Sequence, residues 1–332
     1  MKIFTLNGYF NYGNRLQTFA MAKVLRNFDS NVNTYWPRRF RAKVKEFLKH
    51  YTPLRLKYRK ELKLKKFTKK YMPITSACND TISVVGSDQV WNPDYFKNAM
   101  HLLNGNPNGI NISYAASMGV EALTDNQKEM FRKALKNYRA ISVREKTAKE
   151  LLQPLTDKKI EVVLDPTLLL DKTEYEKIEK KPGNIKLGEK YVLCYILGNP
   201  EYQKIIENFA SENGYRVIMF SDRKNSNYGI EEFLYLLHHA ELVCTDSFHA
   251  SVFSFIFDRP LVIFKRSGAA NYMYSRLQNL VDMFKLTSCE FNGAEISKEN
   301  LSVDYAEGKK ILEKEREKSL KFLKDALEGC DG

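Results

Sequence analysis

Short apolar runs alternate along the chain with amphipathic stretches of helical length. The first unit is an apolar run at 2–7, a loop with glycine and asparagine at 8–14, and a stretch at 15–28 with apolar residues at helical spacing. Strand, loop and helix in this order predict the opening βα unit of an α/β domain. The alternation continues to residue 170, and the sequence predicts the further strands at 32–36, 81–85, 111–117, 140–145 and 160–164.

The segment 171–190 interrupts this pattern because it is charged, contains Pro-Gly and has little to bury. We therefore predict a connection between domains there. Beyond it the alternation restarts, with strands predicted at 190–197, 215–221, 241–246 and 259–264 and helices predicted at 201–214, 229–240 and 247–258.

The chain therefore predicts two Rossmann-like α/β domains that face a cleft, with a long C-terminal helix that crosses back. We expect an N-terminal domain at 1–175, a C-terminal domain at 176–290 and the final helix within 291–332. Ligands of open parallel sheets bind at the carboxyl ends of the strands, so the candidate site residues are sought there.

The net charge of +13 first suggests a nucleic-acid partner, but its distribution along the chain argues against one. Residues 38–71 hold 15 Lys and Arg against two Glu, and the rest of the chain is electrically balanced. Apolar residues run through this basic segment, and Pro53 divides it into two predicted helices. Two interpretations are equally open: contact with an anionic membrane surface, or a solvated face on helices whose apolar side joins the core. No nucleic-acid-recognition motif is present.

The remaining bulk features predict a cytoplasmic protein. No run approaches the roughly 18 apolar residues that a membrane span needs, and the first residues do not resemble a signal peptide. The five cysteines form no CxxC pair and no zinc pattern, and Cys194 and Cys244 lie in apolar strands as expected of core residues. His238 and His239 are adjacent, so we expect no metal pair on one helix face. P-loop, GxGxxG, HExxH and GxSxG motifs are absent.

The loop GSDQVWNP at 86–93 places a carboxylate, amides and an aromatic ring directly after a predicted strand. Asp88 and Asn92 are suited to sugar hydroxyls, and Trp91 to the apolar face of a sugar ring. The alternative is an Asx-type turn in which Trp91 simply fills the core.

Two more predicted strands end in charged or polar residues. Arg144 is predicted either to pair with Glu145 or another neighbour, or to clamp an anion at the cleft. In TDSFHASV, Asp246 or Ser247 is predicted to cap a helix whose first turn carries His249. Helix N-termini attract anions, and a histidine there is suited to proton transfer; a half-buried histidine bonded to a backbone carbonyl is the alternative.

After the strand at 259–264, Lys265, Arg266 and Arg276 are candidates for anion binding or for a solvated loop.

These segments together resemble the polysaccharide pyruvyl transferase family. The resemblance covers about residues 1–286 and rests on an ordered set of motifs: NYGNRLQ (11–17), GSDQVWN (86–92), YAAS (114–117), ISVRE (141–145), DPTLLL (165–170) and TDSFH (245–249). Members are similar in architecture to two-domain GT-B glycosyltransferases. They transfer pyruvate from phosphoenolpyruvate to a sugar of a surface or capsular polysaccharide, usually as a cyclic ketal.

The resemblance implies a role for each candidate. It assigns acid and base catalysis to His249 and Asp88, and donor binding to four residues: Arg144, Ser247, Lys265 and Arg276. It assigns acceptor binding to five: Asn11, Asn14, Gln89, Trp91 and Asn92. It implies no metal and no cofactor. The acceptor would be a lipid-linked or polymeric saccharide, which gives the basic segment 38–71 a use at the inner face of the plasma membrane. A GT-B-type glycosyltransferase with a nucleotide-sugar donor is the alternative.

The chain departs from the family's pattern at one position. Many members have an arginine where this chain has Ser247, two residues before the helix histidine. Another cation must then hold the anionic donor. The resemblance moves this role to the loop at 265–276, and to Arg276 first.

Overall fold

The computed structural model describes residues 1–37, 48, 58–78, 82–186, 188–220, 227–266, 274–293 and 295–329. Most of the basic segment 38–71 lies outside the described residues. The chain divides into two compact units. Unit 1 comprises Met1–Leu170 and Lys314–Gly332, and unit 2 comprises Asp171–Glu313.

The described part of unit 1 contains a seven-stranded sheet in which every pair of neighbouring strands is parallel. In spatial order its strands are β3 (Ile74–Thr75), β2 (Asn33–Tyr35), β1 (Lys2–Phe4), β4 (Ser83–Val85), β5 (Asn111–Ala116), β6 (Tyr138–Val143) and β7 (Ile160–Val162). Ile3 of β1 lies between Thr34 of β2 and Val84 of β4. The strand order reverses between β1 and β4, which creates a switch point at the carboxyl ends of these two strands.

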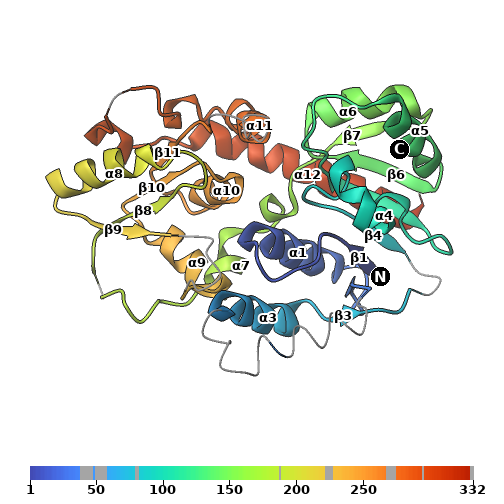
Figure 1. Ribbon diagram of the computed structural model, residues 1–332, viewed down its shortest axis with the longest axis horizontal. Helices are drawn as coiled ribbons and strands as arrows, with labels where there is room; N and C mark the ends of the chain where they lie inside the picture. Colours follow the sequence, from blue (N-terminus) through green and yellow to red (C-terminus); the bar gives the residue numbers. More distant parts are fainter. Residues whose placement is uncertain are drawn as a thin grey trace. The chain divides into compact units, whose positions relative to one another are not determined.

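Helices and short 3₁₀ turns connect these strands (Figure 1). They are α1 (Tyr12–Leu25), α3 (Arg59–Tyr71), η2 (Pro93–Tyr95), α4 (Phe96–Asn104), α5 (Asp125–Leu135), α6 (Lys146–Leu152), η3 (Gln153–Leu155) and η4 (Pro166–Leu168). The side chain of Asn11 accepts a hydrogen bond from the backbone N–H of Asn14 and so caps α1. Thr124 forms a capping box with Gln127 and fixes the start of α5, as the sequence predicts.

Unit 2 is built around a four-stranded parallel sheet in its described residues. In spatial order the strands are β11 (Leu261–Ile263), β10 (Leu242–Thr245), β8 (Tyr191–Tyr195) and β9 (Arg216–Met219). Its helical elements are α7 (Lys172–Glu176), α8 (Glu201–Glu212), α9 (Ile230–His238), α10 (Phe248–Ile256), α11 (Tyr274–Phe284), η6 (Thr287–Cys289) and η7 (Lys298–Leu301). The order reverses between β8 and β10, so unit 2 has a switch point of its own.

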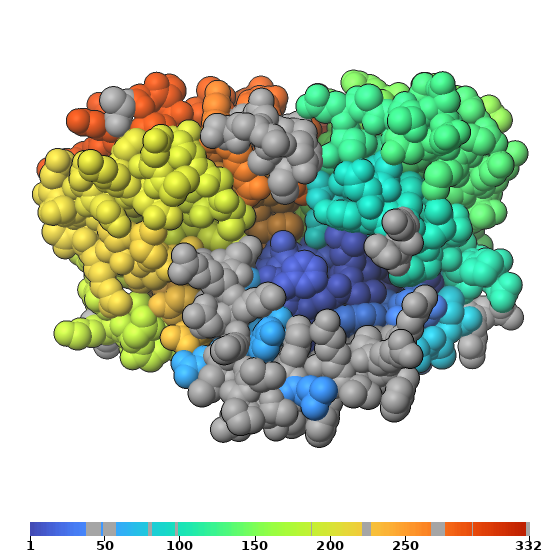
Figure 2. Space-filling view, in the orientation of Figure 1, coloured from blue at the N-terminus to red at the C-terminus, as the bar shows by residue number. Residues whose placement is uncertain are grey.

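The amphipathic pattern of the sequence is visible in α8. Ile206 and Phe209 are buried in the core of unit 2, whereas Glu201 and Lys204 are exposed. The helix belongs to the part of the surface shown in yellow in Figure 2. Gly214 adopts a φ of 69° just beyond the helix, which ends the helix where the sequence predicts.

The prediction of two parallel α/β units is confirmed by the two sheets. The interpretation of 171–190 as a connection with little to bury is wrong at α7. Tyr175 is fully buried, and its ring meets Phe253 edge-on at 4.8 Å between ring centroids, so this segment joins the core of unit 2.

The long helix α12 (Ala306–Glu328) begins in unit 2 and ends in unit 1. Within unit 1, Ser319 accepts a hydrogen bond from the backbone N–H of Leu164, and Phe322 packs against Tyr114. Within the described ranges, no helix is both long and apolar enough to cross a bilayer.

Candidate functional site

The switch point of unit 1 brings together polar residues that are far apart in the sequence. Asn14, in the first turn of α1, donates a hydrogen bond from Nδ2 to Oδ2 of Asp88 at 3.2 Å. Asp88 itself adopts a left-handed φ of 69°, a conformation that costs energy for a residue other than glycine. Strained backbone of this kind is concentrated at functional sites, so the geometry supports a functional role for this loop.

A glycine makes the sharp turn before Asp88 possible. Gly86 has a φ of 130°, and a Cβ atom at this position would lie 2.0 Å from the carbonyl oxygen of Tyr114. Only glycine therefore fits between β4 and β5 at this point. The neighbouring strand β5 is irregular here, with a register shift between Ser113 and Ala116 and a φ of 50° at Ala115.

A buried network lies behind this loop and joins the ends of three strands. The Ser87 hydroxyl donates to Oδ2 of Asp165 at 3.0 Å, and Arg144 donates to the same oxygen at 2.7 Å. The Asp165 side chain is fully buried and the Arg144 side chain is 5% exposed. Burial alone would lower the pKa of Arg144, but the negative charges of Asp165 and Glu145 outweigh it and raise this pKa.

The network decides between the two interpretations of Arg144 in favour of an ion pair. Its closest carboxylate is Asp165, whereas Glu145 lies 3.8 Å away. Glu145 instead accepts hydrogen bonds from the Ser117 hydroxyl and the backbone N–H of Met118. Arg144 thus fixes the site's framework, and its donor-binding role stays a prediction.

Arg15 is a second buried cation, which the sequence analysis missed. Its side chain is fully buried in α1 and donates to the side chain of Asn14 and to the backbone carbonyl of Leu6. Burial lowers its pKa to about 10, against the opposing effect of Tyr9 and Asp88, so the guanidinium remains charged at neutral pH. Among the described residues, its second terminal nitrogen NH1 has no hydrogen-bond partner. An arginine on the otherwise apolar inner side of a predicted helix was the available signal.

The other predicted residues of the 86–93 loop divide into two groups. Gln89 lies next to Asp88 at the switch point of unit 1, and its backbone N–H donates to the Asp88 side chain. Its Nε2 atom is buried without a hydrogen-bond partner in the described structure. Gly119 makes room for this amide, because a Cβ there would lie 1.9 Å from Nε2.

Trp91 and Asn92 have structural roles, which corrects the prediction that they contact the acceptor. The indole of Trp91 is fully buried, donates to the carbonyl of Leu102, and packs edge-on against Phe131 and Tyr138. Asn92 is 4% exposed and caps η2 by accepting from the backbone N–H of Asp94. The Asx turn with a core tryptophan is therefore the correct interpretation.

The switch point of unit 2 is organised around Asp246, which follows β10. Its two carboxylate oxygens accept backbone N–H hydrogen bonds from Leu197 (2.8 Å) and Gly198 (2.7 Å), in the loop after β8. Arg266 approaches the same carboxylate, with Nε 3.3 Å from Oδ2. Asp246 therefore orders the loop instead of capping α10 through its side chain.

His249 lies in the first turn of α10, two residues after Ser247. Ser247 occupies the N-cap position, although its side chain makes no capping hydrogen bond, and its backbone N–H donates to the hydroxyl of Thr245. The imidazole is half-buried, with its ring edge-on to Phe248 at 5.1 Å. The structure thus places His249 at the N-terminus of α10, three residues after Asp246 in the sequence, and its role in proton transfer stays a prediction.

The three cations that follow β11 differ in position. Lys265 is 59% exposed and faces Glu290 at 3.8 Å, whereas the Arg266 side chain is 12% exposed and lies on Asp246. Arg276 is half-buried in α11, a helix that packs against α10. Arg266 therefore lies next to Asp246, just before α10. The resemblance instead moves the donor-binding role to the loop at 265–276, and to Arg276 first.

The cysteine prediction is confirmed for unit 2. Burial raises the pKa of Cys194 to about 12 and also raises that of Cys244, so both thiols stay protonated in the core.

The expectation that His238 and His239 form no metal pair stays a prediction, but the two side chains do meet at one carboxylate. Both imidazoles contact Glu179, because α9 ends at His238 and the backbone of His239 is no longer helical. Adjacent residues separated by a helix end can reach the same partner, which the helical spacing rule does not foresee.

A cavity of about 490 Å³ in unit 1 is lined by none of the predicted site residues. It lies near the first residues of β6 and β7, away from the carboxyl ends of the strands, and α12 forms another wall. The candidate residues thus belong to the switch points and not to this cavity.

Comparison with known proteins gives one family. The family model described as polysaccharide pyruvyl transferase matches residues 11–268, which is most of the chain and includes Asp88, Arg144 and His249. None of the curated proteins matches the chain.

Three solved structures are similar at low sequence identity. An uncharacterized protein from Klebsiella pneumoniae subsp. pneumoniae is 10% identical with a TM-score of 0.49, covering 88% of this chain and 92% of that one. The UDP-GlcNAc 2-epimerase of Neisseria meningitidis, bound to UDP-GlcNAc, is 9% identical with a TM-score of 0.44, covering 98% and 100%. The E. coli heptosyltransferase WaaC with ADP is 10% identical with a TM-score of 0.39, covering 82% and 89%.

Proposed function

The chain belongs to the polysaccharide pyruvyl transferase family, and on this premise we propose that it transfers a pyruvyl group from phosphoenolpyruvate to a sugar of a surface or capsular polysaccharide precursor. The observation that carries the proposal is the position of His249 within the matched region, in the first turn of α10, which begins two residues after Asp246, the carboxylate that pairs with Arg266. A proton donor and a cation are both required by an anionic enol phosphate.

The reaction proposed consumes one phosphoenolpyruvate and two sugar hydroxyls and yields a cyclic ketal and inorganic phosphate. Protonation of the methylene carbon of the donor creates an oxocarbenium-like centre at the carbon that bears the phosphate. One sugar hydroxyl attacks this centre and loses its proton to a base. The second hydroxyl then replaces the phosphate as the carbon–oxygen bond to the leaving group breaks, and its proton is taken up by the departing phosphate. The chemistry needs an acid, a base and cations for the phosphate and carboxylate.

His249 is the proposed acid and Asp88 the proposed base. An imidazole has an ordinary pKa close to neutrality, so it can be protonated at rest and still release its proton. Asp88 is a carboxylate at the switch point of unit 1, oriented by the amide of Asn14.

We propose Arg266 as the main donor-binding cation, ahead of Arg144, Lys265 and Arg276. Arg266 pairs with Asp246, two residues before the first residue of α10, and Asp246 also accepts hydrogen bonds from the backbone N–H groups of Leu197 and Gly198. Ser247 at the N-cap, Lys265 and Arg276 complete the proposed donor set. In unit 1, the buried and incompletely paired guanidinium of Arg15 joins Arg144 as a proposed source of positive charge.

The acceptor is proposed to bind through the amides of Asn11, Asn14 and Gln89. The Nε2 of Gln89 is buried and has no partner among the residues that the structure describes. This supports the assignment, because a buried donor without a partner is costly unless a ligand completes it.

Peripheral contact with an anionic membrane at the cytoplasmic face is also proposed, in an electrostatic form only. In α3, Leu64 and Phe67 are buried and Phe67 packs against Phe19 of α1, so these apolar side chains are committed to the core. Lys66 and Lys69 are exposed. Each such charge near anionic lipid would contribute about 1 kcal/mol, screened by salt.

Calorimetric titration tests the donor. We expect phosphoenolpyruvate to bind the wild type, Arg266→Gln to weaken binding about tenfold or more, and Arg216→Gln, an exposed arginine paired with Glu189, to leave it unchanged. We expect His249→Ala to retain binding and to slow turnover by about 10²–10⁴-fold. Binding of a UDP- or GDP-sugar with no binding of phosphoenolpyruvate would replace the proposal with the nucleotide-sugar alternative.

Co-sedimentation with anionic vesicles tests the membrane contact. Lys66→Glu with Lys69→Glu should reduce binding, and Lys128→Glu with Lys133→Glu on α5 is the matched control. Equal sedimentation of both double variants and the wild type would disprove an electrostatic contact through α3.

A further inference from the structure

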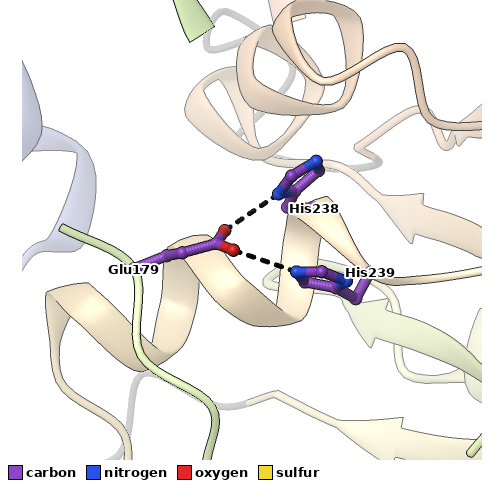
Figure 3. A group of neighbouring side chains, drawn as sticks. All are labelled: Glu179, His238 and His239. Atoms are coloured by element: carbon purple, nitrogen blue, oxygen red, sulfur yellow. Dashed lines mark hydrogen bonds and ion pairs between the residues drawn. The ribbon is translucent and has the colours of Figure 1, made fainter. Parts of the chain in front are cut away.

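Three side chains of unit 2 converge at a place that pyruvyl transfer does not use. Glu179 lies just after α7, and His238 and His239 lie at the end of α9 (Figure 3). Oε2 of Glu179 is 2.9 Å from Nδ1 of His238, and Oε1 is 2.9 Å from Nε2 of His239. One donor atom from each residue can be chosen so that all lie within 4.8 Å of one another.

The backbone around Glu179 is fixed by hydrogen bonds. Its N–H donates to the carbonyl of Tyr175, and the N–H of Lys180 donates to the carbonyl of Glu231 in the first turn of α9. These backbone hydrogen bonds hold the segment around Glu179 against α9. The position of the Glu179 carboxylate therefore does not depend only on its contacts with the imidazoles.

Both imidazole rings are held by aromatic neighbours. His238 stacks on Phe257 with 4.5 Å between ring centroids and an interplanar angle of 19°. His239 stacks on Tyr235 at 4.1 Å and 25°. Rings fixed in this way lose little freedom when a ligand binds, and this preorganisation favours binding.

A second carboxylate, that of Glu176, lies near the imidazole of His238. Oε1 of Glu176 is 3.7 Å from Nε2 of His238, the nitrogen that points away from Glu179. Histidines that bind a metal through one nitrogen usually donate the other N–H to a carboxylate or carbonyl, which fixes the tautomer. A small closure of this gap would give His238 that arrangement, with Nδ1 left for the metal.

Charge and exposure fit a divalent cation. With neutral imidazoles the cluster carries the two negative charges of Glu176 and Glu179. The Glu179, His238 and His239 side chains are 15%, 20% and 42% exposed, so the cluster is reachable from solvent and has room for a water ligand.

We propose that Glu179, His238 and His239 form a binding site for a divalent transition-metal ion such as Zn²⁺, with water completing the coordination. Two imidazoles and a carboxylate are a donor set that these ions prefer over Mg²⁺ or Ca²⁺. Ligand atoms around a tetrahedral ion with bonds near 2.1 Å lie about 3.4 Å apart, so the present spacing requires only side-chain adjustment. The ion would replace the two imidazole–carboxylate hydrogen bonds and tie the segment after α7 to the end of α9.

Metal titration of the full chain tests the site. After treatment with EDTA and its removal, the wild type should bind one equivalent of Zn²⁺ by calorimetry. Co²⁺ should give visible absorption bands without sulfur-to-metal charge transfer. Glu179→Gln and His239→Gln should each weaken Zn²⁺ binding by about tenfold or more, whereas the matched controls Glu201→Gln and His101→Gln should bind as the wild type does.

Unfolding provides a second measurement that does not depend on activity. Zn²⁺ should raise the unfolding midpoint of the wild type and should raise it less in His239→Gln, since a ligand stabilises the state that binds it. His239 is the most exposed of the three residues, so its replacement is the variant least able to disturb folding. Equal Zn²⁺ binding by His239→Gln and the wild type, or no saturable binding by the wild type, would overturn the proposal. Both outcomes are independent of phosphoenolpyruvate binding.

Discussion

The two switch points hold a buried carboxylate in different ways. In unit 1, Oδ2 of Asp165 is held by side chains from other strand ends, Ser87 and Arg144, and Oδ1 accepts from the backbone N–H and the hydroxyl of Thr167. In unit 2, Asp246 is held by two backbone N–H groups of a single loop and by Arg266. The first arrangement joins the ends of three strands through buried side chains and leaves little freedom. The second can adjust when one loop or one side chain moves.

Removing the carboxylate of unit 1 should have the largest effect on stability. Asp165→Ala leaves the buried guanidinium of Arg144 without its closest partner, and we expect a loss of about 3–5 kcal/mol in the free energy of unfolding, measured with urea. Asp125→Ala is the control, because its side chain is 97% exposed where it pairs with Lys128. It should cost less than about 1 kcal/mol. Equal losses would show that the unit 1 network is not rigid.

Two glycines, one near each switch point, test the same difference in rigidity between the two units. Gly86→Ala places Cβ 2.0 Å from a backbone carbonyl oxygen in a left-handed conformation, so we expect a loss of about 3 kcal/mol. Gly198→Ala places Cβ 2.9 Å from the Asp246 side chain, which can move, and should cost about 1 kcal/mol. Thermal unfolding of both variants measures the difference, and a larger loss for Gly198→Ala would reverse the comparison.

Asp246→Asn should act locally. An amide can accept from only one of the two backbone N–H groups, so we expect a loss of about 1–2 kcal/mol together with faster hydrogen exchange at Leu197 and Gly198. Exchange in β5 and β6 of unit 1 serves as the internal control. Unchanged exchange at 197 and 198 would mean that Asp246 does not order this loop.

Glu179 is a more exposed carboxylate and should show the smallest effect. Its pKa falls from an ordinary 4.5 to about 2 in the folded protein, so its stabilisation is complete above about pH 4.5 and is lost as the pH falls towards 2. In buffer with EDTA, Glu179→Gln should therefore cost about 1 kcal/mol near neutral pH, and this difference should shrink below pH 4.5. A difference that does not change with pH would contradict the lowered pKa.

The fold and the location of the candidate residues were accessible from the sequence because both depend on local patterns. Apolar runs followed by polar residues mark strand ends, and strand ends meet at one edge of a parallel sheet. This is how Asp88, Arg144 and His249 could be selected from residues spread over most of the chain.

The errors concern contacts that local patterns do not encode. Trp91 lies in a polar loop, but Phe131 and Tyr138, which enclose it, follow about forty residues later. Arg266 and Lys265 differ by one position, and only the path of the chain after β11 decides which one meets Asp246. Similarly, the meeting of His238 and His239 at Glu179 depends on where α9 ends.

The route of α12 has a consequence for the order of synthesis. Residues 314–329 belong to unit 1, where Arg316 donates to the carbonyl of Leu168 and Ser319 accepts from Leu164. A chain leaving the ribosome has therefore made all of unit 2 before it makes the last segment of unit 1. Domains fold as units during translation, so the first unit to be started is the last to be completed, and it awaits this helix with part of its surface uncovered.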